Sequence, residues 1–238
     1  MKLSTLMTAL AVSAGLTAGI ANAQPRKTAA PAAPVNAVKG VIAEEIPAKP
    51  FGAPVDLWLH VLHNNDGESK VLSLTGPQAG FGGAAFFVSL VNNLKAQADQ
   101  PRADGVAQGW VMISSGDNIL PGVNLNAAIS NGVPYYDSIL FNLIGYSAIT
   151  LGNHDFDSGP DILANLIAGT NNTVFVSSNL NFAFEPGLLA QQNQGKLARS
   201  RVVTVDGRQV GIVGATTESL PTISSPRNTI VNPVAAAV

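Results

Sequence analysis

Cysteine is absent from the 238-residue chain. No disulfide framework and no thiolate metal site can form, so any bound metal ion must be held by oxygen and imidazole ligands. Charged residues make up only 12% of the chain and the formal net charge is −2, whereas roughly 25% charged residues is typical of globular proteins. Lysine and arginine do not cluster, which excludes an electrostatic footprint for nucleic acid or an anionic membrane surface.

Long apolar runs are also lacking after residue 23. Residues 1–23 begin with one positive charge at Lys2, continue through an apolar stretch and end at Ala21-Asn-Ala23. This layout predicts a signal peptide cleaved before Gln24, and therefore export to the periplasm or the extracellular space without a stable membrane anchor. Residues 24–54 are rich in alanine and proline and are predicted to be a linker. Residues 55–238 form the predicted folded domain.

Within that domain, β-prone segments alternate with amphipathic ones, which predicts a layered α/β fold. Polar turns follow the predicted strands. The expected strands cover residues 55–63, 109–115, 145–150, 173–178 and a hairpin of 201–205 with 209–215, and the expected helices cover 81–98, 134–145 and 161–168.

Three of these strands end in turns that carry possible metal ligands. The turn residues are Asp66 and Glu68 after the first strand, Asp117 after the second, and Asn153, His154 and Asp157 after the third. Right-handed crossovers bring neighbouring strand ends to the same edge of a sheet, so the three turns are expected to converge. Carboxylate and amide oxygens suit a hard divalent metal ion, and a pair of such ions can clamp a phosphoryl group. Taken alone, each turn is weak evidence, and the turn that carries Asn153, His154 and Asp157 could also be an ordinary polar loop.

The motifs resemble the calcineurin-like metallophosphoesterases, and in particular the secreted 5'-nucleotidase and nucleotide-sugar hydrolase family. The resemblance covers residues 57–219, and Gly152-Asn-His-Asp-Phe-Asp157 is its most specific run. It implies a layered α/β/β/α sandwich that is incomplete at the C-terminus. The supporting segments are residues 62–66, 82–85, 115–118, 142–146, 176–180 and 210–217.

The resemblance also implies roles for individual residues. Asp66 would bind the first of two divalent metal ions, Asp117 would bridge both, and Asn153 would bind the second. His154 would stabilise the transition state at the phosphate, oriented by Asp157. A structural alternative for Asp157 is the N-cap of the helix that follows. The metal could be Mn, Zn, Mg or Ca.

The chain departs from the family pattern in two places. Glu68 stands where the family commonly has histidine, and we interpret it as a variant ligand that favours harder ions. The family also takes further histidine ligands, and a substrate-recognition domain, from segments beyond residue 238. His60 and His63 lie within the first predicted strand and are expected to be packed there. The metal is therefore expected to be held weakly by these residues alone.

The function that the resemblance implies is metal-dependent hydrolysis of a small phosphate ester, with a nucleotide as the expected substrate. A phosphodiesterase or a broad-specificity phosphomonoesterase on the same scaffold is an alternative. A catalytically silent exported binding module is another. Asp155 receives no role, and the oligomeric state stays open.

Overall fold

The computed structural model describes residues 55–79 and 82–237. The predicted signal peptide (1–23) and linker (24–54) lie outside the described residues and stay predictions. The chain divides at residue 55, and the folded unit begins at Asp56. Within the described ranges, no helix is both long and apolar enough to cross a membrane.

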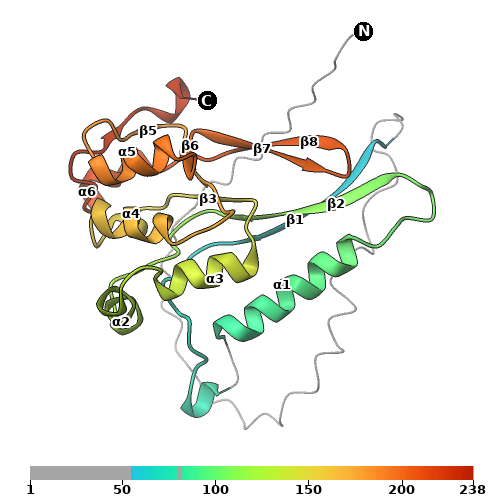
Figure 1. Ribbon diagram of the computed structural model, residues 1–238, viewed down its shortest axis with the longest axis horizontal. Coiled ribbons are helices and arrows are strands. Elements are labelled where there is room, and N and C mark those ends of the chain that lie inside the picture. The colour runs from blue at the N-terminus through green and yellow to red at the C-terminus, as the bar shows by residue number, and fades with distance from the viewer. Residues whose placement is uncertain (1–54, 80–81, 238) are drawn as a thin grey trace, which may run out of the picture. The chain divides into compact units, whose positions relative to one another are not determined.

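A five-stranded parallel sheet forms the centre of this unit (Figure 1). The strands lie side by side in chain order, so each right-handed crossover advances in the same direction and places its helix on the same face. The strands are β1 (Leu57–Asn64), β2 (Ala107–Ser114), β3 (Ala148–Thr150), β4 (Phe175–Val176) and β6 (Leu197–Ala198).

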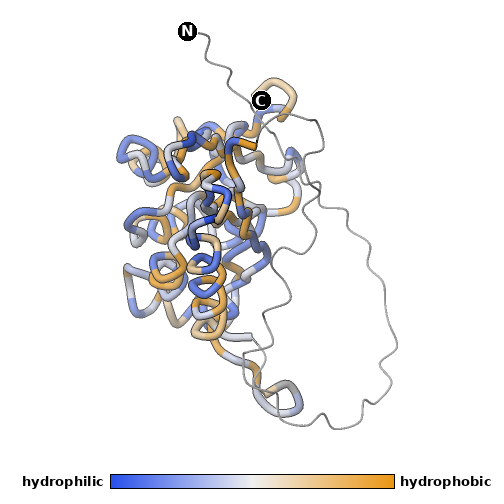
Figure 2. The backbone as a smooth tube through the Cα atoms, turned by 90° about the vertical axis from the view of Figure 1, so that its right-hand side faces the viewer, coloured by the Kyte–Doolittle hydropathy of each residue, from blue (hydrophilic) through white to orange (hydrophobic). Residues whose placement is uncertain are grey.

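Helices follow the strands and enclose the core against the sheet. Met112 on β2, Ile149 on β3, Phe141 on α3 and Leu163 on α4 are all buried in one hydrophobic cluster. Hydrophobic and hydrophilic stretches alternate along the backbone, as expected for elements with one face in the core (Figure 2). The helices are α1 (Ala84–Ala98), α2 (Val123–Asn131), α3 (Tyr136–Ile144), α4 (Pro160–Ala168), α5 (Pro186–Asn193) and α6 (Leu220–Ile223).

Two short antiparallel pairs complete the unit. β5 (Leu180–Asn181) pairs with β9 (Ile230–Val231), and β7 (Ser200–Val205) forms a hairpin with β8 (Arg208–Val213). The hairpin contacts β2 where Gly109 leaves room for Val205, because a Cβ at residue 109 would collide with that valine. Asp206 in the hairpin turn accepts a hydrogen bond from the backbone N–H of Gln108 at 3.0 Å.

The predicted α/β class, with a parallel central sheet and helices, is confirmed. The third strand is shorter than predicted and begins at Ala148. Its first expected residue, Gly145, instead ends α3 in the left-handed conformation (φ 67°), which glycine adopts without steric cost. Helices α2, α5 and α6 were not predicted from the sequence.

Candidate functional site

The carboxyl ends of the first three strands meet at one edge of the sheet. Asn64 at the end of β1 is in register with Ser114 on β2, and Ser114 is in register with Ile149 on β3. Three loops follow these ends: loop 1 (residues 65–70), loop 2 (115–119) and loop 3 (151–157). Backbone N–H groups of Asp66 and Glu68 donate to the carbonyls of Gly116 and Asp117, both at 3.1 Å. The predicted convergence of the three turns is thus observed.

Loops 2 and 3 touch through two glycines. A Cβ on Gly152 would collide with the backbone nitrogen and the Oδ1 of Asp117, and a Cβ on Gly116 would collide with the backbone of Gly152. Gly116 also has a φ of 103°, which L side chains rarely adopt. These contacts bring Asp117 against the start of the loop that carries Asn153 and His154.

The buried carboxylate of Asp155 joins the same two loops by accepting hydrogen bonds from backbone N–H groups of both. Its side chain is buried, with Oδ2 accepting from the N–H groups of Gly152 at 2.8 Å and Asp117 at 3.1 Å. Its Oδ1 accepts from Asn118 at 3.0 Å and Ile119 at 3.3 Å. Burial raises the pKa of Asp155 to about 7. The N–H groups of Gly152, Ile119 and Asn118 oppose that shift, and the negative charge of Asp117 adds to it. Sequence reasoning assigned Asp155 no role, because three of its four donors lie 36–38 residues away in loop 2.

Asp117 lies at the centre of the edge. Its Oδ1 accepts a hydrogen bond from the backbone N–H of His154 at 2.8 Å. Burial raises the pKa of Asp117, the N–H of His154 opposes that shift, and the negative charges of Asp66 and Asp157 add to it. Backbone hydrogen bonds join loop 1 to loop 2, and the His154 N–H joins loop 3 to Asp117, so Asp117 lies between the other two loops.

His154 and Asp157 form a side-chain pair. The distance from Nδ1 to Oδ2 is 2.6 Å, and because a carboxylate can only accept, Nδ1 carries the hydrogen. This hydrogen bond raises the pKa of His154. The His154 side chain is 38% exposed, so the imidazole remains accessible to solvent.

Asp157 is not a helix N-cap, and that alternative is wrong. The N-cap of α4 is Gly159, and no side chain caps this helix. The carboxylate of Asp157 is instead used by side chains: Oδ2 pairs with His154, and Oδ1 accepts a hydrogen bond from the Ser224 hydroxyl at 2.6 Å.

In the part of the chain that the structure describes, the acidic side chains of loop 1 contact only neighbouring residues of the same loop, unlike those of loop 3. Asp66 and Glu68 both have positive φ angles, 54° and 51°. The Asp66 carboxylate accepts a hydrogen bond from the Asn65 amide, and Glu68 forms an ion pair with Lys70 at 3.0 Å. The buried anchor of this loop is Ser69, whose hydroxyl donates to Asp137 on α3 at 3.2 Å.

The candidate metal ligands are chemically suitable but are not gathered into a finished site. Three carboxylates and the half-buried Asn153 offer oxygen donors of the kind that hard divalent ions prefer. Among residues 55–79 and 82–237, no group of three or more His, Cys, Asp or Glu side chains is arranged to hold a metal ion. Asp66 and Glu68 each use one carboxylate oxygen in their present contact, with Asn65 and Lys70 respectively.

His60 and His63 both lie within β1, as predicted. His60 is half-buried there, but His63 is exposed, so the expectation that it is packed is wrong.

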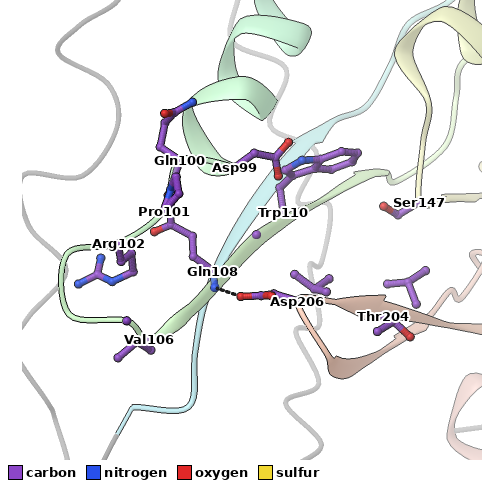
Figure 3. Close-up of a pocket in the computed structure, with 14 residues that line it drawn as sticks. Asp99, Gln100, Pro101, Arg102, Val106, Gln108, Trp110, Ser147, Thr204 and Asp206 are labelled. Atoms are coloured by element: carbon purple, nitrogen blue, oxygen red, sulfur yellow. Dashed lines mark hydrogen bonds between the residues drawn. The ribbon is translucent and has the colours of Figure 1, made fainter.

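A cavity of about 710 Å³ lies near the opposite ends of the strands. Trp110 on β2, Arg102 beyond α1 and Thr204 on β7 are among its lining residues (Figure 3). Gln108 and Asp206, which also line it, belong to the start of β2 and to the hairpin turn. The cavity is therefore separate from the edge at which loops 1–3 meet.

Known proteins resemble this chain in fold and in sequence. A 5'-nucleotidase precursor from Thermus thermophilus superposes with a TM-score of 0.59 and 28% identity over 74% of this chain and 32% of that chain. The 5'-nucleotidase of Mus musculus is 28% identical over 73% of this chain and 28% of its own length. This chain shares the metallophosphoesterase fold of the 5'-nucleotidases. The predicted resemblance is confirmed.

A second relative is the trifunctional nucleotide phosphoesterase protein YfkN of Bacillus subtilis (strain 168). This chain is 31% identical to it over 120 residues, which are 40% of this chain and 8% of the relative. No protein-family model matches the chain. The chain spans less than a third of the length of each of these three relatives.

Proposed function

We propose that this 5'-nucleotidase-like domain hydrolyses phosphate esters, and that its substrate is a nucleotide. The observation that carries the proposal is the His154–Asp157 pair, held beside Asp117 at the edge where three strand ends meet. Relatives named 5'-nucleotidase support the nucleotide as substrate. The apolar residues 1–23, and relatives named as snake venom 5'-nucleotidases, support export.

In this proposal Asp66, Glu68, Asp117 and Asn153 would hold two divalent metal ions. Such ions supply a water of lowered pKa and neutralise charge on the phosphoryl group. Asp117 lies between the other two loops, so it is the proposed bridging ligand. Loop 1 would bring Asp66 and Glu68 to the ions from one side, and loop 3 would bring Asn153 from the other.

His154 would act on the phosphate directly. Asp157 holds Nδ1, which leaves Nε2 as the nitrogen that can donate to a phosphate oxygen. The raised pKa of His154 increases the fraction of imidazolium near neutral pH. A cationic donor that is held in place before reaction stabilises the negative charge that develops in the transition state.

Hydrolysis of AMP and of p-nitrophenyl phosphate by the full chain tests the proposal. Each substrate is assayed with Mn²⁺, Co²⁺ and Zn²⁺, and binding of Mn²⁺ is measured separately by calorimetry. Asp117→Ala is expected to remove both activity and Mn²⁺ binding. His154→Ala is expected to lower the activity about 100-fold or more while Mn²⁺ binding persists, because one general acid or oxyanion donor contributes on that scale.

Two substitutions serve as matched controls. Asp104→Ala removes a carboxylate that pairs with Arg102 before β2, and His60→Ala removes an imidazole inside β1. Both variants should keep wild-type activity. Turnover of bis(p-nitrophenyl) phosphate in place of AMP would indicate the phosphodiesterase alternative. Absence of turnover with all three metals would favour the silent binding module.

A further inference from the structure

Asp157 uses both of its carboxylate oxygens at once. Oδ2 pairs with His154 Nδ1 at 2.6 Å, and Oδ1 accepts from the Ser224 hydroxyl, also at 2.6 Å. A carboxylate held through one oxygen can still rotate about its terminal bond. One held through both oxygens presents a fixed lone pair to the imidazole. Ser224 therefore limits the orientations that Asp157 can offer to His154.

The helix that precedes Ser224 in the chain fixes its position. It follows α6 directly, and its backbone N–H donates to the carbonyl of Leu220 at 3.1 Å. Leu220 is fully buried in the hydrophobic core. The hydroxyl is thus attached to a turn of helix whose first residue cannot move without disturbing the core.

The segment that follows Ser224 is fixed by an ionic cluster. Arg227 donates to Glu185, which is buried at the start of α5, and also to Asp161 on α4 at 2.7 Å. The backbone N–H of Asn228 donates to Glu185 at 2.6 Å. A buried carboxylate that is paired in this way is costly to separate from its partners. Ser224 consequently lies between two anchored points.

We propose that Ser224 is a positioning residue that holds Asp157, and through it the Nδ1–H tautomer and orientation of His154. The inference rests on the proposed role of His154 in phosphate-ester hydrolysis. It goes beyond that role because it adds a group 67 positions from Asp157 in the sequence, outside the motif run. Partners that orient an imidazole in this indirect way typically change activity by about 10- to 100-fold when they are removed.

A purely structural role for Ser224 would have different consequences. If its hydroxyl only closed the loop after α6, its loss would lower stability and would leave the imidazole and the chemical step unchanged. If it positions Asp157, the loss acts on kcat and on the tautomer of His154. KM for the substrate should change little, because Ser224 donates to Asp157 and is one step removed from the imidazole.

The test uses the full chain with three substitutions. Ser224→Ala removes the hydroxyl. Ser224→Thr keeps it, and the extended backbone at residue 224 (φ −152°, ψ −169°) suits a β-branched side chain. Ser225→Ala makes the same chemical change one residue later, at an exposed position. The primary readout is the pair of ¹⁵N shifts of the His154 ring at alkaline pH, where a neutral ring reports its tautomer. Circular dichroism confirms that each variant is folded.

Ser224→Ala is expected to shift His154 towards a mixture of tautomers and to lower kcat about tenfold, with KM within about twofold of wild type. Ser224→Thr should restore both measurements, and Ser225→Ala should change neither. An unchanged tautomer in folded Ser224→Ala overturns the inference, whatever the activity. A wild-type chain that hydrolyses no ester overturns the proposed function instead, and the ¹⁵N measurement still decides the role of Ser224.

Discussion

Loops 1 and 3 both carry proposed functional side chains, yet the two loops hold these side chains by different means. In loop 3 the buried Asp155 binds four backbone N–H groups, and His154 and Asp157 are already paired. In loop 1 the backbone is fixed by Ser69, while the carboxylates of Asp66 and Glu68 make only local contacts with Asn65 and Lys70. One half of the site is therefore organised in advance, and the other half has a fixed backbone with side chains still to be placed.

Asp155→Asn should destabilise loop 3 and its contact with loop 2 more than any other substitution considered below. An amide in place of one carboxylate oxygen turns a donor towards two backbone N–H groups, and each buried group left unsatisfied costs about 1–3 kcal/mol. We expect the free energy of unfolding, measured in urea, to fall by about 4 kcal/mol. Asp206→Asn is the matched control, because Asp206 is exposed and accepts one backbone N–H. Equal losses in the two variants would contradict the role assigned to Asp155.

Gly152→Ala should separate loops 2 and 3 without removing any polar group. The new Cβ would meet the backbone of Asp117, which cannot move aside in the way that a flexible side chain can. Overpacking of this kind should lower the free energy of unfolding by about 3 kcal/mol, and it should displace the proposed bridging ligand. Gly211→Ala on β8, where the space is open, is the control. Wild-type stability and wild-type hydrolysis of AMP in Gly152→Ala would show that the contact is dispensable.

Asp137→Asn tests the anchor of loop 1 through the pH dependence of the free energy of unfolding. Burial raises the pKa of Asp137 from 3.8 to about 6. The folded state therefore binds this proton more tightly than the unfolded state, so its stabilising contribution is complete below about pH 4 and is lost as the pH rises through about 6. We expect the free energy of unfolding in the wild type to fall by about 2 kcal/mol over this range on account of Asp137.

The comparison is made on urea unfolding curves at pH 4, 5, 6 and 7. Asp137→Asn keeps an oxygen to accept from Ser69 and should give a flatter profile than the wild type. Asp56→Asn changes an exposed aspartate and should preserve the wild-type slope. Parallel profiles for wild type and Asp137→Asn would show that this carboxyl does not govern the pH dependence.

Lys70→Met should have the smallest effect. The Lys70 side chain is 67% exposed, and exposed ion pairs contribute roughly 0–1 kcal/mol. The free energy of unfolding should stay within about 0.5 kcal/mol of wild type, and calorimetric Mn²⁺ binding should not weaken, since Glu68 is released from a competing cation. A loss of more than about 1 kcal/mol would mean that this pair, and not Ser69, fixes loop 1.

The sequence predicted the parallel α/β arrangement because each strand is a short β-prone segment with a polar turn behind it. It also predicted that Asp66, Asp117 and His154 follow neighbouring strands at one edge, since that depends on chain order and crossover handedness alone. It could not predict the role of Asp155, whose donors are backbone groups that any sequence supplies. Nor could it predict Ser224, which reaches Asp157 from a distant helix end.

The helix N-cap alternative for Asp157 was wrong for a related reason. Aspartate is a common N-cap residue, but the cap is the residue directly before the helix. In α4 that residue is Gly159, and the Asp157 carboxylate pairs with His154 and Ser224 instead.

The short helices α2, α5 and α6 were not predicted. Helix α2 buries only Leu125 and Ala128, α5 buries only Leu188 and Gln191, and α6 has four residues. None of them carries a long repeated spacing of apolar residues, which is the signal of a helix in a sequence.

The contact between Gly116 and Gly152 has a consequence for protein engineering. Since neither residue can gain even a methyl group without disturbing the other loop, loops 2 and 3 behave as a single exchangeable cassette. A donor sequence for one of them will be accepted only together with its own partner loop. Loop 1 touches this cassette through backbone hydrogen bonds, which do not depend on side-chain identity. Its positions other than the buried anchor Ser69 can therefore be varied separately from loops 2 and 3.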